Sequence, residues 1–313
     1  MTLNPQETAF LFPGQGSQAL GMGKELANAY AVARETFEEA DDILGFSLSA
    51  IMWGEDEDSL NDTLNTQPAL FVHSFAAWRV FNEYAPEFRP ATVAGHSLGE
   101  LSALAVAGAI SFEQGLRLVR RRGELMQRAG EIAPGGMAAI LGLDIPNLEK
   151  VCADASAGDD VVEVANDNCP GQVVISGAKP ALERALALAT EAGARRAVPL
   201  AVSIAAHSPL MAVVQTEFAA AVADAKITES GIPVVGNVTA SELKTVAEIE
   251  ADLRAQLTSR VRWTESVQSM LARGITTFVE VGSGNVLSGL LRRIDRGTKG
   301  IPFGTPDDSG SVF

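Results

Sequence analysis

A serine set between two glycines is the residue whose surroundings most clearly indicate chemistry in this chain. Residues 95–99 read Gly-His-Ser-Leu-Gly, a G-x-S-x-G pattern with Ser97 at its centre. A short run that can enter a sheet precedes the pattern, and strong helix formers follow from Glu100. The glycines of such a strand–turn–helix permit a strained turn, and the first N–H groups of the helix point at an oxyanion formed there. We therefore predict that Ser97 is a nucleophile.

A nucleophilic serine needs a general base, and the chain has three histidines: His73, His96 and His207. His96 adjoins Ser97, so the two side chains should diverge at the turn. His73 lies in an apolar helical stretch, which favours a buried structural histidine. His207 follows a strand-like segment and precedes a helix that Pro209 can start, because proline suits the first helical turn. We predict that His207 is the base.

The segment after the strand expected at residues 8–12 admits two interpretations. Residues 14–19 match the dinucleotide-binding pattern G-x-G-x-x-A. That pattern requires a second strand that ends in an acidic residue about twenty positions later, whereas residues 24–44 read as polar helix. We favour a loop whose glycines expose the backbone N–H groups around Gln15, because an oxyanion hole needs a second donor.

Further motifs run in order over nearly the whole chain. They occupy residues 12–18, 66–70, 95–100, 122–127, 136–139, 168–177, 207–211, 233–238, 256–263 and 280–287. With these motifs the chain resembles the malonyl-CoA:acyl carrier protein transacylases of fatty acid synthesis, and it is similar to the acyltransferase domains of polyketide synthases. The resemblance implies ping-pong transfer of a malonyl group from malonyl-CoA, through a malonyl-serine, to the phosphopantetheine thiol of acyl carrier protein.

The resemblance also implies roles for residues around the serine. Ser97 is the expected nucleophile and His207 its base, and a backbone carbonyl at Gln256 orients the histidine in place of an acidic partner. The backbone N–H groups of Gln15 and Leu98 are the expected oxyanion hole.

Polar residues that recognise the substrate are implied in the same way. Arg122 lies in an arginine-rich helical run whose other arginines we expect on a solvated face. The match assigns Arg122 to the malonyl carboxylate, which a planar guanidinium can bind through two parallel hydrogen bonds. His96, Gln67 and Asn168 match polar positions that line the family's site, and structural hydrogen bonding remains the alternative for Gln67 and Asn168.

The expected partners are acyl carrier protein and coenzyme A thioesters. Carrier proteins are acidic and this chain has a formal net charge of −15, so docking needs a local basic patch. The candidates, near the cleft mouth by resemblance, are Arg195, Arg196, Arg292 and Arg293. The alternative is that these arginines balance neighbouring acids such as Glu191 and Asp295.

Composition restricts the class of protein. The chain has 313 residues and is 47% apolar, enough for a large core, and no uncharged apolar run reaches the about eighteen residues of a membrane span. The N-terminus lacks signal-peptide features. Cys152 and Cys169 form no C-x-x-C pair, so we expect reduced thiols and no metal site. The acidic balance argues against nucleic acid and anionic membranes. We expect a cytoplasmic monomer without a cofactor.

The order of elements predicts an α/β fold. Residues 1–131 and 201–313 are expected to form an α/β-hydrolase-like core with a parallel sheet, to which residues 233–296 return. Residues 132–200 read strand–helix–strand–strand–helix–strand, a ferredoxin-like (βαββαβ) subdomain inserted between nucleophile and base. Residues 305–313 are expected to be a loose tail.

Other functions remain open at this point. A serine hydrolase or thioesterase of α/β-hydrolase type shares G-x-S-x-G, but it would place an acid between serine and histidine, where this chain has the insert. A non-catalytic module that docks carrier proteins is disfavoured by the Ser97–His207 pair. The acyl group is also open, because the small Ala206 before the base would admit methylmalonyl; malonyl is the leading expectation.

Overall fold

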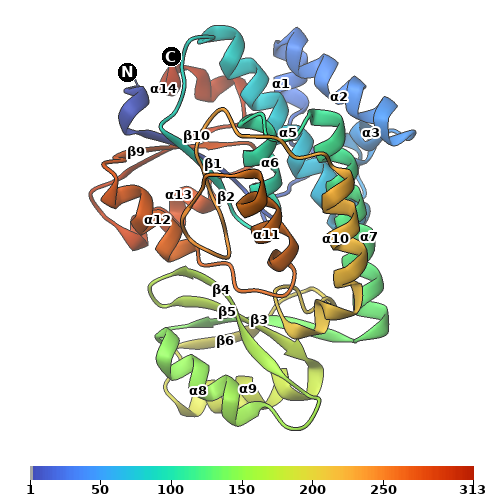
Figure 1. Ribbon diagram of the computed structural model, residues 1–313, viewed down its shortest axis with the longest axis vertical. Coiled ribbons are helices and arrows are strands. Elements are labelled where there is room, and N and C mark those ends of the chain that lie inside the picture. Colours follow the sequence, from blue (N-terminus) through green and yellow to red (C-terminus); the bar gives the residue numbers. More distant parts are fainter. Residues whose placement is uncertain (1–2) are drawn as a thin grey trace.

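The computed structural model describes residues 3–313, which form two β-sheets covered by helices (Figure 1). The larger sheet has the strand order β10-β9-β1-β2-β7-β8. Five of its strands are parallel, and β8 pairs antiparallel with β7. Its strands are β1 (Thr8–Phe12), β2 (Thr92–Gly95), β7 (Val234–Val235), β8 (Glu242–Leu243), β9 (Thr277–Val281) and β10 (Lys299–Phe303).

Helices cover both faces of this sheet. β1 and β2 are buried at every position, as parallel strands with helices on both faces must be. Five helices separate β1 from β2, so the second strand that a dinucleotide-binding unit requires does not follow β1. The helices of this part are α1 (Lys24–Ala29), α2 (Ala31–Leu44), α3 (Leu48–Trp53), α4 (Glu57–Asn61), α5 (Thr63–Tyr84), α6 (Leu98–Val106), α7 (Phe112–Ile132), α10 (Gln215–Asp224), α11 (Val246–Gln256), α12 (Trp263–Ala272), α13 (Val286–Ile294) and α14 (Ser309–Val312).

The smaller sheet confirms the ferredoxin-like arrangement. Its order is β4-β5-β3-β6, and its neighbours are all antiparallel. Figure 1 shows this sheet at the lower end of the molecule, with its two helices on the outer face. The elements are β3 (Gly135–Leu141), α8 (Ile145–Ala155), β4 (Val162–Cys169), β5 (Gln172–Ala178), α9 (Lys179–Glu191) and β6 (Arg196–Pro199).

The small sheet and its helices share a core of their own. Ile140 and Ile175 on the strands pack with Leu148 on α8 and Leu182 on α9. We therefore propose the division given by the sequence, with residues 132–200 as a subdomain and residues 1–131 and 201–313 as the catalytic core.

Backbone hydrogen bonds join the two parts. The N–H of Val261 donates to the carbonyl of Ala165 on β4 at 2.8 Å, and the N–H of Asp167 donates back to Val261 at 2.9 Å. The helix-free face of the small sheet is thereby held against the core, and a cleft between them is lined by both.

The C-terminal segment differs from the sequence expectation. Residues 305–313, expected to be loose, form a 3-10 turn and α14, with Val312 buried and the Phe313 ring against Tyr84 and Phe303. The preceding strand β10 also lies beyond the predicted limit of the sheet at residue 296. Its Gly300 and Pro302 weaken the sequence signal for a strand, but an edge strand tolerates both.

Candidate active site

Ser97 occupies the turn between β2 and α6 with φ 51° and ψ −107°, a conformation that non-glycine residues rarely adopt. The flanking glycines make the turn possible. A Cβ at Gly95 would lie 1.9 Å from the carbonyl oxygen of Gly99, and one at Gly99 would lie 2.0 Å from that of Phe12. The local sequence therefore fixes a tight strand-to-helix crossing with the serine at its apex.

The structure brings Ser97 and His207 together from distant segments. Ser97 Oγ lies 2.8 Å from His207 Nε2, and His207 Nδ1 lies 2.8 Å from the carbonyl oxygen of Gln256 and 3.2 Å from that of Ser259. Because a carbonyl oxygen only accepts, the Nδ1 contacts require the proton on that atom. Nε2 is then free to accept the serine proton, which is the geometry of a general base.

His207 is buried, and its charge state follows from its surroundings. Burial first, and the positive charge of Arg122 second, lower the pKa of His207 to about 3. The imidazole is therefore neutral in the resting protein. It precedes a 3-10 helix, Pro209–Val214, as predicted, but residues 201–208 contain no strand, so only the helical half of the expected junction is present.

Arg122 on α7 also contacts Ser97, and its side chain is only 1% exposed. Its Nη1 donates to Gln67 Oε1 at 2.7 Å, and its Nη2 donates to Gln256 Oε1 at 2.9 Å and to Ser97 Oγ at 3.0 Å. Burial lowers the pKa of Arg122 to about 10, which leaves the guanidinium charged near neutral pH. None of the ion pairs in residues 3–313 includes it. A buried cation next to the serine is thus held by neutral partners, two amide oxygens and the Ser97 hydroxyl.

Two residues with unpaired backbone N–H groups line the cleft at the serine. Leu98 is the first residue of α6, and Gln15 lies in the loop after β1, the strand beside β2. Neither N–H has an acceptor among the described residues. An oxyanion hole needs unpaired donors, so these two residues stay its candidates.

A cleft of about 320 Å³ surrounds these groups. Ser97, His207 and Arg122 form its core side, and the helix-free face of the small sheet forms the other, with Met137 and Val174 among its apolar residues. The small sheet also contributes Asn166, Asn168 and Gln172, so the wall opposite Ser97 is partly apolar and partly polar.

The remaining polar candidates divide between the cleft and the interior. His96 and Asn168 line the cleft, with His96 Nε2 2.8 Å from Asn168 Oδ1, so the His96 side chain does turn away from Ser97. Gln67 was expected to line the site, but it is fully buried behind Arg122 and is not part of the cleft wall. His73 is buried, with Nε2 2.9 Å from the carbonyl oxygen of Gly304, in agreement with a structural role.

The four docking candidates are exposed, and two of them lie near glycine turns, Arg195 beside Gly142 and Arg293 beside Gly171. Arg293 on α13 donates to Gln172, which lines the cleft, and to the carbonyl of Pro170 at 3.3 Å. Gly142 connects the two segments, because its N–H donates to the carbonyl of Gly171 and it also lies next to Arg195. A Cβ added at Gly142 would be only 3.1 Å from the Cβ of Arg195. Among residues 3–313 none of the four arginines forms an ion pair, so the alternative that they balance Glu191 and Asp295 is not observed.

Asn237 is a site residue that the sequence analysis did not single out. Its Oδ1 accepts the backbone N–H of Ser97 at 2.7 Å, and its Nδ2 donates to the carbonyl of Gly95 at 2.7 Å. Asn237 therefore hydrogen-bonds the backbone on both sides of the turn that carries Ser97. A signal was available, because Asn237 follows β7, which lies beside β2, and the carboxyl ends of parallel strands adjoin.

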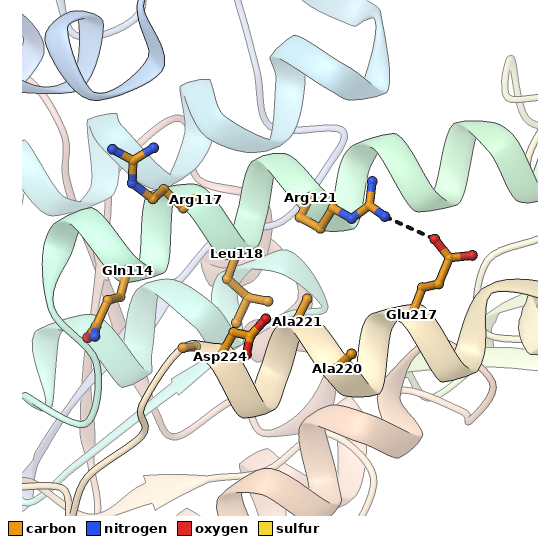
Figure 2. A pocket seen from close by; sticks show the side chains of 9 residues that line it. Gln114, Arg117, Leu118, Arg121, Glu217, Ala220, Ala221 and Asp224 are labelled. Atoms are coloured by element: carbon orange, nitrogen blue, oxygen red, sulfur yellow. Dashed lines mark hydrogen bonds and ion pairs between the residues drawn. The ribbon is translucent and has the colours of Figure 1, made fainter.

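A second hollow shares no lining residue with the cleft at Ser97. It has a volume of about 440 Å³ between α7 and α10, and Arg121 and Glu217 form an ion pair of 3.0 Å across it (Figure 2). Its lining holds no serine, histidine or cysteine among the described residues. We therefore place the active site in the cleft at Ser97.

Two kinds of feature are absent from residues 3–313. No group of three or more histidine, cysteine, aspartate or glutamate residues is arranged to hold a metal ion. No helix there is both long enough and apolar enough to cross a membrane.

Comparison with known proteins identifies relatives along the whole chain. The family model described as the acyl transferase domain matches residues 9–299. The malonyl CoA-acyl carrier protein transacylase of Bacillus subtilis is 44% identical over 301 residues, which cover 96% of this chain and 94% of that protein. The protein of the same name from Haemophilus influenzae is 46% identical over 286 residues, or 91% of each chain.

Solved structures agree over the full length. The acyl carrier protein S-malonyltransferase of Vibrio cholerae superimposes with a TM-score of 0.95 at 45% identity, covering 98% of this chain and 100% of that one. A malonyl-transacylase in complex with a type II PKS acyl-carrier protein gives 0.95 at 42% identity, with 98% of both chains covered. With its elbow serine, its histidine and its two-sheet architecture, the chain belongs to the acyl transferase domain family.

Proposed function

We propose that this protein transfers a malonyl group from malonyl-CoA to the phosphopantetheine thiol of an acyl carrier protein and so supplies fatty acid synthesis. One observation carries the proposal. The Ser97 hydroxyl lies between a neutral imidazole at 2.8 Å and a buried guanidinium at 3.0 Å that no carboxylate in residues 3–313 pairs. The names of the relatives support the same activity.

The first half-reaction forms an ester. His207 Nε2 takes the proton of Ser97 Oγ as this oxygen attacks the thioester carbonyl of malonyl-CoA, and the backbone N–H groups of Gln15 and Leu98 stabilise the oxyanion. The carbon–sulfur bond breaks, and the coenzyme A thiolate takes the proton back from His207. The carbonyls of Gln256 and Ser259 orient the imidazole throughout.

The second half-reaction reverses these roles with a different thiol. The phosphopantetheine thiol of the carrier protein gives its proton to His207 and attacks the malonyl-serine ester. The carbon–oxygen bond to Ser97 breaks, and the serine oxygen recovers the proton. Malonyl has then moved from one thioester to another, and the enzyme is unchanged.

Arg122 is the proposed partner of the malonyl carboxylate. Its two amide partners, Gln67 and Gln256, hold the guanidinium plane beside the nucleophile without neutralising it. A charged hydrogen-bond partner in such a buried place contributes more than a surface ion pair does. A hydrolase of apolar esters would have no use for this charge.

The acyl group has a second candidate. Ala206 lines the cleft beside His207, and its small side chain leaves room for the methyl branch of methylmalonyl. Competition among malonyl-, methylmalonyl- and acetyl-CoA, read by intact mass of the acyl-enzyme, separates these substrates.

We further propose a cytoplasmic monomer that works without a bound cofactor and docks its carrier through Arg195, Arg196, Arg292 and Arg293. The buried, unpaired state of Cys152 and Cys169 suits a reducing compartment. The exposed arginines beside Gln172 supply the positive surface that an acidic carrier needs at the cleft mouth.

The nucleophile is tested directly by mass spectrometry. Ser97→Ala should abolish both the malonyl-enzyme and transfer while leaving the fold intact, and His207→Ala should lower transfer by about 10³-fold or more. Continued malonylation of the Ser97→Ala protein at this site would refute the assignment.

The depressed pKa of His207 predicts an unusual pH profile for malonyl loading. The neutral base persists as the pH falls through about 6.5, so kcat/KM should not decline there. The decline should come at lower pH, towards the shifted pKa of about 3. In Arg122→Met, measured with acetyl-CoA, the loss of the nearby positive charge should move this decline to higher pH. An acid limb near 6.5 in the unaltered enzyme would contradict the prediction.

Removing Arg122 should change which acyl group is transferred. Arg122→Ala should lower kcat/KM for malonyl-CoA by about 10²–10³-fold, the usual result of truncating one member of a buried charge pair, and affect acetyl-CoA much less. Arg117→Ala is the matched control, because Arg117 is an exposed arginine on the same helix that pairs with Glu113. Equal losses for both acyl groups would make Arg122 structural.

Charge reversal should expose the docking surface. Arg195→Glu with Arg196→Glu should raise the KM for the carrier and weaken its salt dependence, while loading from malonyl-CoA stays nearly normal. Arg34→Glu on α2, at the other end of the molecule in Figure 1, is the control. If this pair and the reversed Arg292 and Arg293 both leave the KM unchanged, docking occurs elsewhere.

A further inference from the structure

Gln256 makes hydrogen bonds to three residues of the proposed reaction centre: Ser97, Arg122 and His207. Its backbone oxygen accepts from His207, its side-chain Oε1 accepts from Arg122 at 2.9 Å, and its Nε2 donates to the carbonyl of Ser97 at 3.1 Å. The side chain is fully buried. The orientation of this one amide therefore decides whether Arg122 meets an acceptor or a second donor.

Glu100 fixes that orientation. It lies in the first turn of α6, is fully buried, and its Oε2 lies 2.5 Å from Gln256 Nε2. A carboxyl oxygen here requires the NH₂ group of the amide on its side. The amide oxygen must then face Arg122.

The second oxygen of Glu100 is buried without a partner. Oε1 has no hydrogen-bond partner among the described residues. A buried carboxylate oxygen that accepts no hydrogen bond makes the ionised form costly, so this geometry favours the protonated acid. The nearby buried carboxyl of Asp252 accepts the backbone N–H groups of Val238 and Thr239, at 3.2 and 3.0 Å.

The electrostatic surroundings agree with a protonated Glu100. Burial first, and the neighbouring Asp252 second, raise the pKa of Glu100 well above its ordinary value. The charged and titratable groups around it are Asp252 on α11, Arg122 on α7 and, beyond Gln256, His207.

We propose that Glu100 is a positioning residue that acts as a neutral acid, fixing the Gln256 amide and leaving the charge of Arg122 free for an anionic acyl group. An ionised carboxylate at this place would be an internal counter-ion and would compete with the substrate carboxylate. The inference rests on the proposed function, because it concerns the malonyl carboxylate.

Three variants, each compared with the unaltered enzyme for malonyl-CoA and acetyl-CoA, test this role. Glu100→Ala should lower the malonyl-to-acetyl ratio of kcat/KM by about tenfold or more, since Arg122 loses its fixed partner. Glu100→Gln keeps a neutral acceptor for Gln256 Nε2, so it should restore the ratio to within about threefold. Leu101→Ala opens a cavity on the same helix and should lower the Tm but leave the ratio unchanged.

The pH dependence of malonyl loading shows whether Glu100 is neutral or ionised. It requires only the Glu100→Gln variant, which keeps the hydrogen bond to Gln256. Malonyl loading should have the same profile in Glu100→Gln and in the unaltered enzyme between about pH 6 and pH 9, because neither side chain ionises there. An inflection that Glu100→Gln removes, an equal loss in Glu100→Gln and Glu100→Ala, or an unchanged ratio in Glu100→Ala would overturn the inference. Absence of malonyl transfer in the unaltered enzyme would instead refute the proposed function.

Discussion

The site depends on one buried positive charge, the guanidinium of Arg122. Removing a cation from water is costly unless hydrogen bonds replace the lost solvent, and here two amide oxygens and a hydroxyl do so. Neutral partners leave the charge uncompensated. That charge disfavours the imidazolium form of His207, and so helps to keep the base neutral beside the nucleophile. It also creates a place where an anion is favoured, so under the proposed function the same residue both keeps the base neutral and selects the substrate.

Tight backbone contacts hold this arrangement. The positive φ of Ser97 is a strained conformation, and strain of this kind persists only where the surroundings fix it. The glycines at 95 and 99 let the crossing close, and Asn237 bonds the backbone on both sides of the serine. The core thus fixes the polar groups around Ser97, whereas the small sheet contributes the opposite wall of the cleft, in which Met137 and Val174 are apolar and Asn168 and Gln172 are polar. Such a site combines rigid polar groups with a shaped, partly apolar surface.

The sequence predicted the elements and residues that have local signals. The elbow, the helix at residues 145–155 and the βαββαβ order follow from glycine spacing and hydrophobic periodicity, and the structure reproduces them. Only the family resemblance could indicate the role of Gln256, because its contact with His207 uses a backbone oxygen, which every residue has. Asn237 and Asp252 are far from Ser97 in sequence, so nothing near the serine indicates them. The tail at 305–313 was misjudged because its order comes from packing of the Phe313 ring against Phe81 and Tyr84, which are distant in sequence.

Charge acts at two depths in this molecule, with different physical consequences. The formal net charge of −15 opposes both anionic substrates, the malonyl thioester and the acidic carrier. The exposed arginines near Gln172 can offset it only through a field that salt screens over about 8–10 Å. Arg122 lies where screening is weak, so its preference for a carboxylate should change little with ionic strength. Under the proposed function, encounter with the carrier is therefore the salt-sensitive step and recognition of the acyl group the salt-insensitive one, so that one acidic protein can bind two anions in succession.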